Sequence, residues 1–171
     1  KKVVDIIVED LSENFDKSMV DSQVSVGDIN KEKRNSKSCF IPSSYWISGF
    51  CRHYVNLANE DNFNYNLHAG YENHIVQYSL YKPDCYYKWH TDYYQREGGV
   101  RKLSFSLQLS NYDEYKGGDL QLIDEENQMY LAPKKRGSII IFDSRIRHRV
   151  RRVTEGERRS LVGWITGPNW K

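Results

Sequence analysis

The spacing of apolar and polar positions divides the chain near residue 70. Residues 43–63 carry apolar side chains every three or four positions, which predicts an amphipathic helix capped by Ser43 or Ser44. Residues 8–23 are expected to form another helix that begins at Ser12. Between these two segments, residues 27–38 are polar and are expected to form a loop.

From residue 72 the pattern changes to short runs that are typical of β-strands, with glycine and proline in the turns between them. The runs cover residues 73–81, 100–110, 118–124, 128–132, 137–143, 145–153 and 159–167. Several short strands at this spacing favour a barrel or jelly roll, and the lack of a helical pattern after residue 70 excludes a strand–helix–strand sheet. We therefore expect a mainly β (α+β) jelly roll with flanking N-terminal helices.

The composition narrows the class of protein only slightly. Charged residues make up 28% of the 171 and the net charge is +2, which is too small to indicate a nucleic-acid binder by itself. Three cysteines without a CxxC pair indicate neither a disulfide framework nor a zinc cluster. No apolar run approaches the roughly 18 residues of a membrane span and no signal peptide is visible, so we expect a cytoplasmic protein without a membrane partner. The chain begins at Lys1 instead of Met, which leaves a processed or trimmed upstream segment open.

Two histidines and an aspartate form a candidate metal site. In a strand, His90 and Asp92 would share one face, where they can hold a cation or form an ordinary surface pair. In residues 145–151 arginines alternate with apolar residues and His148; because arginines face water, His148 is expected to point inward, as a metal ligand or as a buried imidazole satisfied by a backbone carbonyl. Two imidazoles and a carboxylate make the facial triad that holds Fe(II). Zinc fits the same set, but the HExxH motif of hydrolytic zinc sites is absent.

An iron site that activates oxygen needs two electrons, and if 2-oxoglutarate supplies them, its distal carboxylate needs a cation inside the barrel. Arg158 follows His148 on the next strand, with Ser160 on the same face, and a guanidinium matches a carboxylate with two parallel hydrogen bonds. Alternatively, Arg158 continues the basic face begun by the preceding arginines. In residues 103–109 the polar side chains share one face, which is either solvent-exposed or lines a cavity where Gln108 binds the cosubstrate.

Several motifs follow one another in order over residues 72–169. They are Tyr81-Lys-Pro, His90-Thr-Asp92, "RKLSFSLQLS", "YKGGDLQL", "RGSIIIFDS" and "RHRVRRVTEGERRSLVGWITGP". The pattern resembles the prolyl 4-hydroxylase-like branch of the 2-oxoglutarate/Fe(II)-dependent dioxygenases, whose fold is a double-stranded β-helix, a jelly roll with flanking helices. Without a linker or repeat, the chain is expected to be one domain, residues 1–171, with a helical support region over residues 1–70 and a double-stranded β-helix oxygenase core over residues 72–169.

The resemblance implies both a site and an activity. By position, His90, Asp92 and His148 would be the iron ligands, and Arg158 would bind the distal carboxylate of 2-oxoglutarate. The implied enzyme is an Fe(II)- and 2-oxoglutarate-dependent dioxygenase that uses O2 to hydroxylate a protein or peptide, with a prolyl residue as the first candidate target, and converts 2-oxoglutarate to succinate and CO2. Ascorbate is the expected reductant, and no residue beyond the metal centre needs to act as a catalytic base.

Further contacts follow from the same resemblance. Tyr81 falls where relatives place a tyrosine that hydrogen-bonds the distal carboxylate, and Gln108 falls where they often present an aromatic hydroxyl. Trp164 falls where relatives have an indole that borders the active site. Ordinary packing inside the barrel is the alternative for Tyr81 and Trp164.

The aromatic residues around the His-Thr-Asp motif suggest how a substrate binds. Flat rings at a barrel mouth can hold an extended, proline-containing peptide, which loses little entropy on docking. The rings expected to border such a peptide are Tyr87, Trp89, Tyr93, Tyr94 and Trp164. Alternatively, half of them pack against the helices. Residues 92–101 are expected to form a lid with Gly98 and Gly99 as its hinge.

Two other functions stay open. The same chemistry can act on a nucleic acid or a small molecule, since rings stack on bases and the basic residues 134–136 and 145–152 offer phosphate contacts. Outside enzymology, a non-catalytic metal-binding jelly-roll module can bind nucleic acid through the same face, although a run of charges is commonly just a solvated face. Conversion of 2-oxoglutarate to succinate separates this last function from the two enzymatic ones.

Overall fold

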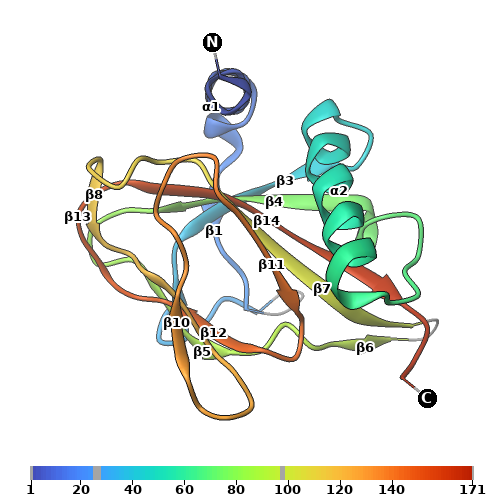
Figure 1. The fold of residues 1–171 in the computed structure, drawn as a ribbon. Coiled ribbons are helices and arrows are strands. Elements are labelled where there is room, and N and C mark those ends of the chain that lie inside the picture. Colours follow the sequence, from blue (N-terminus) through green and yellow to red (C-terminus); the bar gives the residue numbers. More distant parts are fainter. Residues whose placement is uncertain (1, 25–27, 97–98, 171) are drawn as a thin grey trace.

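The computed structural model describes residues 2–24, 28–96 and 99–170, and β-strands dominate it (Figure 1). Two helices, α1 (Val3–Asn14) and α2 (Trp46–Ala58), lie on one side of the larger sheet. Short turns of 3-10 or π-helix cover Asp16–Ser18 (η1), Asn59–Phe63 (η2) and Glu72–His74 (η3). Among the helices of the described residues, none combines the length and the apolar character needed to cross a bilayer.

The described strands form a larger sheet, a smaller sheet and a short ribbon, and all of them pair antiparallel. The larger sheet runs in the order β1 (Val20–Asp21), β3 (Lys37–Pro42), β4 (Ile75–Tyr81), β14 (Arg158–Gly167), β7 (Gly99–Gln108) and β11 (Ile139–Asp143), with β6 (Gln95–Arg96) also paired to β7. The smaller sheet runs in the order β10 (Met129–Leu131), β9 (Leu120–Ile123), β12 (Arg147–Val150), β5 (Tyr86–His90) and β2 (Arg34–Asn35). The ribbon pairs β13 (Val153–Gly156) with β8 (Tyr115–Gly117). This architecture confirms the mainly β fold class, with each strand-like run after residue 72 containing a strand.

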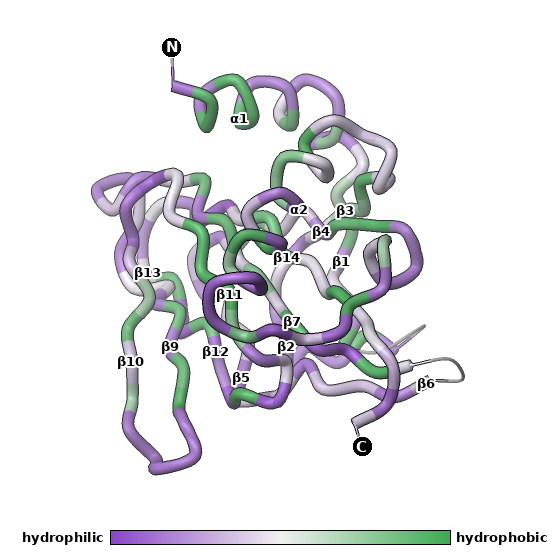
Figure 2. The backbone as a smooth tube through the Cα atoms, turned by 45° about the vertical axis from the view of Figure 1, so that its right-hand side comes forward, coloured by the Kyte–Doolittle hydropathy of each residue, from purple (hydrophilic) through white to green (hydrophobic). Residues whose placement is uncertain are grey.

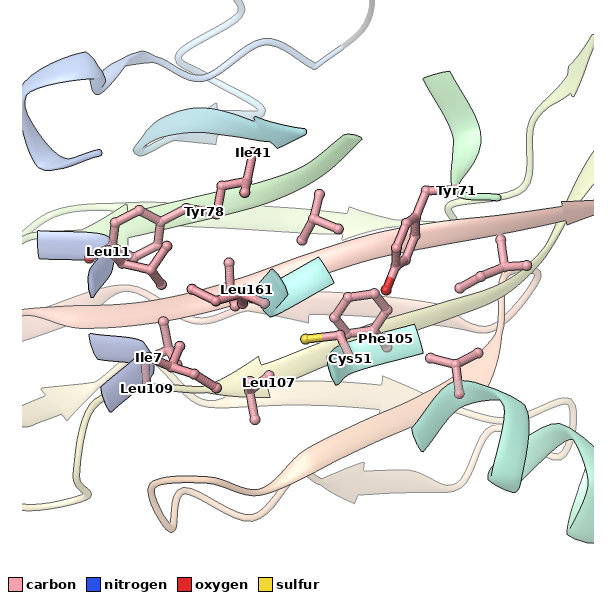
Figure 3. Packing of buried hydrophobic residues seen from close by; sticks show 14 of the residues in the cluster. Ile7, Leu11, Ile41, Cys51, Tyr71, Tyr78, Phe105, Leu107, Leu109 and Leu161 are labelled. Carbon is pink, nitrogen blue, oxygen red and sulfur yellow. The ribbon is translucent and has the colours of Figure 1, made fainter. Parts of the chain in front are cut away.

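The larger sheet packs each of its faces against a different layer. Leu103 and Leu107 of β7 belong to the core that this sheet forms with α1 and α2. Figure 3 shows Ile7 and Leu11 of α1 against this core, and burial of each such side chain contributes roughly 1.5–3 kcal/mol. The opposite face looks toward the smaller sheet, where Phe142 belongs to a second apolar cluster. The helices therefore cover one face of the larger sheet, and a functional site can form on the other face, between the two sheets.

The first helix begins earlier than its expected start at Ser12. It covers Val3–Asn14, because the apolar repeat that reaches the core, including Ile7 and Leu11, lies upstream of that serine. Figure 2 shows hydrophobic and hydrophilic residues alternating along α1, as in a helix with one buried face. Helix α2 begins at Trp46, after Tyr45 as its N-terminal flanking residue, so neither expected serine caps it.

The expectation that residues 1–70 are a helical region with a polar loop at its centre is wrong for residues 34–42. Strands β2 and β3 occupy this stretch, and β3 pairs along its whole length with β4 of the larger sheet. Its two serines, Ser36 and Ser38, are buried without being unsatisfied, since the hydroxyl of Ser22 forms a hydrogen bond of 2.9 Å with each of their hydroxyls. Local polarity suggested a loop, whereas hydrogen bonds to a distant segment make it a strand.

A candidate metal centre between the two sheets

Three candidate ligands converge where β5 and β12 meet. These strands are antiparallel neighbours that place His90 directly opposite His148, and Asp92 follows two residues after the end of β5. The Nε2 atoms of His148 and His90 lie 3.4 Å and 3.7 Å from the carboxylate oxygens of Asp92. One potential ligand atom from each residue lies within 4.8 Å of the others. The sheet therefore brings His148 next to His90 and Asp92, which lie more than fifty positions earlier in the sequence.

Backbone carbonyls fix how both imidazoles are oriented. The Nδ1 atom of His90 lies 2.8 Å from the carbonyl oxygen of Lys88, and that of His148 lies 3.0 Å from the carbonyl oxygen of Ile146. A carbonyl can only accept, so each Nδ1 carries the proton and each neutral ring offers the lone pair of Nε2. The donor set consists of two such nitrogens and one carboxylate, which suits Fe(II) and leaves coordination positions open for other ligands.

Burial and neighbouring charges keep His90 and Asp92 in the protonation states that metal binding requires. Burial, followed by the proximity of His148, lowers the pKa of His90 to about 4. Burial alone would raise the pKa of Asp92, but His148, His90 and a hydrogen bond from Trp164 hold it below its usual value. At neutral pH, His90 is thus neutral and Asp92 is ionised, so neither has to lose a proton to bind a cation.

Hydrogen bonds to the backbone of Asp92 position this residue, and the sequence did not indicate them. Its backbone N–H donates to the carbonyl oxygen of Ser144 at 3.0 Å, and Nη1 of Arg101 donates to its carbonyl oxygen at 3.3 Å. Arg101 forms an ion pair with the buried Glu72, and its guanidinium carbon lies 4.3 Å from the centre of the Trp164 ring. Glu72 and Arg101 are 29 positions apart, so no local pattern indicates this brace.

Arg158 is buried without an acidic partner. It lies opposite Tyr81 on the neighbouring strand, is 3% exposed, and donates from Nη1 to the hydroxyl of Ser160 at 3.1 Å. No carboxylate among the described residues forms an ion pair with it. Arg159, by contrast, points to the other face of the sheet and pairs with Asp16. Of the two adjacent arginines, alternation therefore turns only Arg158 toward the smaller sheet.

A cavity between the sheets, the inner cavity, connects the three candidate ligands with Arg158. It is lined by Arg34, Gln77, Ser79, Tyr81, Tyr87, His90, Asp92, Phe105, Ser106, Leu120, Phe142, His148, Val150, Arg158, Ser160, Val162 and Trp164. Tyr81 and Ser160, the residues expected to contact the cosubstrate, both line this cavity, and so does Trp164. Ser106, on the polar face of β7, is buried and lines this cavity. The polar face of β7 therefore faces the inside of the protein and not solvent.

Gln108 lies beside the inner cavity, in a small adjoining pocket with Tyr115. Its side-chain amide nitrogen donates to the Tyr115 hydroxyl at 3.0 Å and to the carbonyl oxygen of Ser110 at 3.1 Å. Both N–H groups of the Gln108 amide therefore already have acceptors within the protein. Tyr115 was not singled out from the sequence, although it opens the "YKGGDLQL" motif. The second glycine of that motif, Gly118, has a φ of +62°, and a Cβ there would lie 3.2 Å from Cδ of Arg158. The motif therefore makes room for the arginine.

A second depression, the outer groove, adjoins the inner cavity and shares Arg34, Gln77, Tyr87, Asp92 and Trp164 with it. It is lined by Gln23, Val24, Arg34, Phe40, Glu72, Asn73, Ile75, Gln77, Tyr87, Thr91, Asp92, Tyr93, Tyr94, Arg101 and Trp164. Tyr87, Tyr93, Tyr94 and Trp164 thus lie where the sequence analysis expected aromatic residues to border a substrate. Of the expected hinge, Gly98 lies outside the described residues and Gly99 begins β7.

Trp89 faces away from both the inner cavity and the outer groove. Because side chains alternate along a strand, the inward His90 turns Trp89 to the outer face of the smaller sheet. There the guanidinium carbon of Arg149 lies 4.6 Å from its ring centre. The structure therefore removes Trp89 from the expected substrate contacts.

Acidic side chains neutralise part of the basic face. Arg145 pairs with Asp143, Arg151 with Asp119 and Arg152 with Asp84. Lys134 and Arg136, in the other basic stretch, pair with Asp119 and Asp5. Arginines already paired with acids have less charge to offer to phosphates, which weakens the nucleic-acid alternative.

Comparisons with known proteins agree with this geometry. The model of the 2OG-Fe(II) oxygenase superfamily matches residues 76–166, more than half of the chain. A PKHD-type hydroxylase from Parvibaculum lavamentivorans is 39% identical over 87 residues, which cover 51% of this chain and 39% of the relative. One from Synechococcus is 42% identical over 79 residues, which cover 46% and 36% of the two proteins. The matched part of the chain thus spans about two-fifths of the length of these relatives.

Solved structures show the same fold at low sequence identity. A prolyl-4-hydroxylase from Pseudomonas putida superposes with a TM-score of 0.75 at 18% identity, covering 98% of this chain and 86% of that one. A prolyl hydroxylase from Trichoplax adhaerens, solved with a peptide fragment of the hypoxia inducible factor oxygen degradation domain, gives a TM-score of 0.78 at 17% identity and covers 97% and 79%. These likenesses support the jelly-roll fold with flanking helices.

Proposed function

Because the chain belongs to the 2OG-Fe(II) oxygenase superfamily, we propose that it is an Fe(II)- and 2-oxoglutarate-dependent dioxygenase that hydroxylates a protein or peptide, with a prolyl residue as the first candidate target. One observation carries the proposal: two imidazole nitrogens and a carboxylate converge in a cavity that is also lined by Arg158, whose buried guanidinium forms no ion pair with an acid among the described residues. The prolyl target is supported by the solved prolyl hydroxylases of the same fold, one of which holds a peptide.

His90, Asp92 and His148 would hold the iron. The donor set fits Fe(II), and the carbonyl contacts at Nδ1 keep both Nε2 atoms aimed at one point, so that little reorganisation is needed on binding. When bound, iron and 2-oxoglutarate supply the oxidation by O2 that hydroxylates a C–H bond and yields succinate and CO2, with ascorbate as the proposed reductant. The chain's own part is to fix the ligands, enclose the site and direct the substrate.

Arg158 would hold the distal carboxylate of 2-oxoglutarate. A buried guanidinium is costly without a counter-ion, and the dicarboxylic acid supplies one that binds through two parallel hydrogen bonds. The hydroxyl of Ser160 orients the guanidinium from one side, and Tyr81 lines the same part of the inner cavity. The Tyr115 hydroxyl, close enough to Arg158 for a hydrogen bond, supplies the aromatic hydroxyl that Gln108 replaces in the family pattern.

Substrate binding is assigned to the outer groove. Tyr87, Tyr93, Tyr94 and Trp164 give it an aromatic wall, and rings of this kind suit an extended peptide that contains proline. Asp92 and Trp164 line both the groove and the inner cavity, so a residue bound in the groove meets the metal centre directly.

The test is a pair of measurements on one reaction mixture that contains Fe(II), 2-oxoglutarate, ascorbate and a panel of proline-containing peptides. We expect peptide-dependent release of succinate, and a mass increase of one oxygen on a prolyl residue of the stimulating peptide. Succinate release with the oxygen on another residue would contradict the prolyl target. No conversion of 2-oxoglutarate under any of these conditions would contradict the dioxygenase activity itself.

A further inference from the structure

A second arginine is buried at the site without an acid, and the proposed activity does not use it. Arg34 of β2 is 5% exposed, and it donates from Nε to the hydroxyl of Ser36 at 3.0 Å and from Nη1 to the carbonyl oxygen of Gln23 at 3.1 Å. Both acceptors are neutral, and within the described ranges no carboxylate forms an ion pair with Arg34. Removing a charge from water without a counter-ion is strongly unfavourable, so such a group points to a missing anion.

The position of Arg34 places that anion next to the metal centre. Arg34 lines both the inner cavity and the outer groove, where the two join. Its guanidinium carbon lies 4.8 Å from the centre of the Tyr87 ring, which is stacked on the His90 ring at 3.6 Å. The Tyr87 ring therefore contacts both the Arg34 guanidinium and the ring of His90, a candidate metal ligand.

The formal charges of the site leave Arg34 unbalanced. Fe(II) and Asp92 together leave one positive charge, Arg158 adds a second, and the two carboxylates of 2-oxoglutarate cancel both. The positive charge of Arg34 then remains in an enclosed space. Among the hydrogen bonds within the described residues, Nη2 of Arg34 makes none, so it is available to a ligand along with the second N–H of Nη1.

We propose that Arg34 binds a carboxylate of the substrate and thereby directs an acid-bearing substrate to the metal centre. This inference rests on the proposed function, because it takes iron and 2-oxoglutarate as the other occupants of the site. The carboxylate is either an acidic side chain next to the target residue or a terminal carboxylate on the target itself. Both present the same planar pair of oxygens to the guanidinium fork.

The test compares matched acid and amide probes for binding, without turnover. One pair is a blocked dipeptide of proline and aspartate and its asparagine counterpart; the other is N-acetyl-L-proline and its amide. Calorimetric titration, with Mn(II) and 2-oxoglutarate present and oxygen absent, is applied to the wild type and to Arg34→Gln and Arg34→Lys. Arg52→Gln is the matched control, since Arg52 also donates to neutral acceptors, here the Asn56 side chain and two backbone carbonyls, but lines neither the cavity nor the groove.

In the wild type, the acid of at least one pair is expected to bind about tenfold or more tighter than its amide, and the pair that shows the difference identifies the source of the carboxylate. Arg34→Gln should reduce the ratio to about 1, Arg34→Lys should keep part of it because the charge remains, and Arg52→Gln should leave it unchanged. Equal binding of acid and amide by the wild type, including no binding of either, would overturn the inference, as would a preference that survives in Arg34→Gln. Circular dichroism confirms that each variant is folded.

Failure of this inference and failure of the proposed function give different results. The binding experiment measures the affinity of the anion site without turnover. Succinate formed from 2-oxoglutarate in the presence of the same probes measures the oxygenase activity. Succinate release without any acid preference would remove the role of Arg34 and leave the dioxygenase intact. An acid preference lost in Arg34→Gln, in a protein that never forms succinate, would instead retain the anion site and contradict the dioxygenase.

Discussion

At the scale of single residues, the backbone prepares each histidine for its role. Lys88 and Ile146 accept the Nδ1 protons and so aim Nε2 of His90 and His148 at Asp92. The convergence of the three side chains is what distinguishes a metal site from a buried histidine that merely satisfies its own hydrogen bonds. Substitutions that remove one donor atom therefore test the assignment atom by atom.

His148→Ala should abolish specific metal binding. Loss of one of three protein ligands is expected to weaken Mn(II) or Fe(II) binding by about two orders of magnitude or more. His148 faces the cavity, so the free energy of unfolding of the metal-free protein should change by only about 1 kcal/mol. Calorimetric metal titration and urea unfolding check the two statements. Metal affinity like that of the wild type would remove His148 from the ligands.

Arg158→Ala should raise the KM for 2-oxoglutarate by about 100-fold, because a buried carboxylate would lose its charge partner. Arg159→Ala is the matched control: its side chain pairs with Asp16 and donates to the Tyr78 hydroxyl on the other face of the sheet. That variant should lose about 1–3 kcal/mol of stability while its KM stays unchanged. Steady-state kinetics and urea unfolding measure both. An unchanged KM in Arg158→Ala would contradict the assignment.

The lowered pKa of His90 predicts acid sensitivity of the metal-free protein. Between about pH 6.5 and pH 4 the unfolded chain binds a proton at this residue that the folded chain does not, so stability falls as the pH falls through this window. The groups that face His90 here are His148, Asp92 and Arg34. By pH 4 the loss amounts to about 2–3 kcal/mol. Urea unfolding at pH 7, 5.5 and 4.5 should show a shallower loss in His90→Gln; an equal loss in both proteins would be evidence against it.

Much of the residue-scale site could be predicted, but not all of it. His90 and Asp92 stand out because they share one face of a strand, and His148 stands out because it alternates with arginines that face water. Arg34 could not be predicted in this way, since its role depends on being buried beside Tyr87, more than fifty positions away. Sequence spacing reveals residues on one strand, whereas a pairing between distant segments leaves no local pattern.

At the scale of elements, the site depends on how strands and loops are held together. The antiparallel pairing of β5 with β12 places His90 beside His148. The ion pair between Glu72 and Arg101 positions the loop that carries Asp92, because Arg101 also donates to the backbone carbonyl of Asp92. The strands after residue 72 were predictable because alternation and turns mark them. Strands β2 and β3 were not, because residues 34–38 are polar and the strands that they pair with, β5 and β4, lie far away in the sequence.

Removing the Glu72–Arg101 brace should weaken metal binding without removing a ligand. Arg101→Gln is expected to lower metal affinity about 10- to 100-fold, since Asp92 and the Trp164 ring lose a contact that positions them. Lys116→Gln, which breaks an exposed ion pair with Glu155, should leave metal affinity unchanged. Calorimetric titration with Mn(II) compares the two. Equal affinities in both variants would show that the brace does not position the ligands.

At the scale of the whole molecule, two helices cover one face of the larger sheet and the smaller sheet closes over the other (Figure 1). The inner cavity lies between the sheets and opens into the outer groove, so the reacting groups are enclosed while an extended substrate can still reach them. The fold class followed from the sequence, and four of the five aromatic residues expected at the opening line the outer groove, whereas Trp89 lies on the outer face of the smaller sheet.

The claim on which the account rests is that His90, Asp92 and His148 together hold one iron that works with 2-oxoglutarate and O2. The most direct test supplies Fe(II), 2-oxoglutarate, ascorbate and the same panel of proline-containing peptides to the wild type and to His148→Ala under ¹⁸O2 and measures the mass of the succinate formed. The wild type should produce succinate with one labelled oxygen, and the variant should produce none above the protein-free background. Unlabelled succinate, or equal amounts of labelled succinate from both proteins, would contradict the claim.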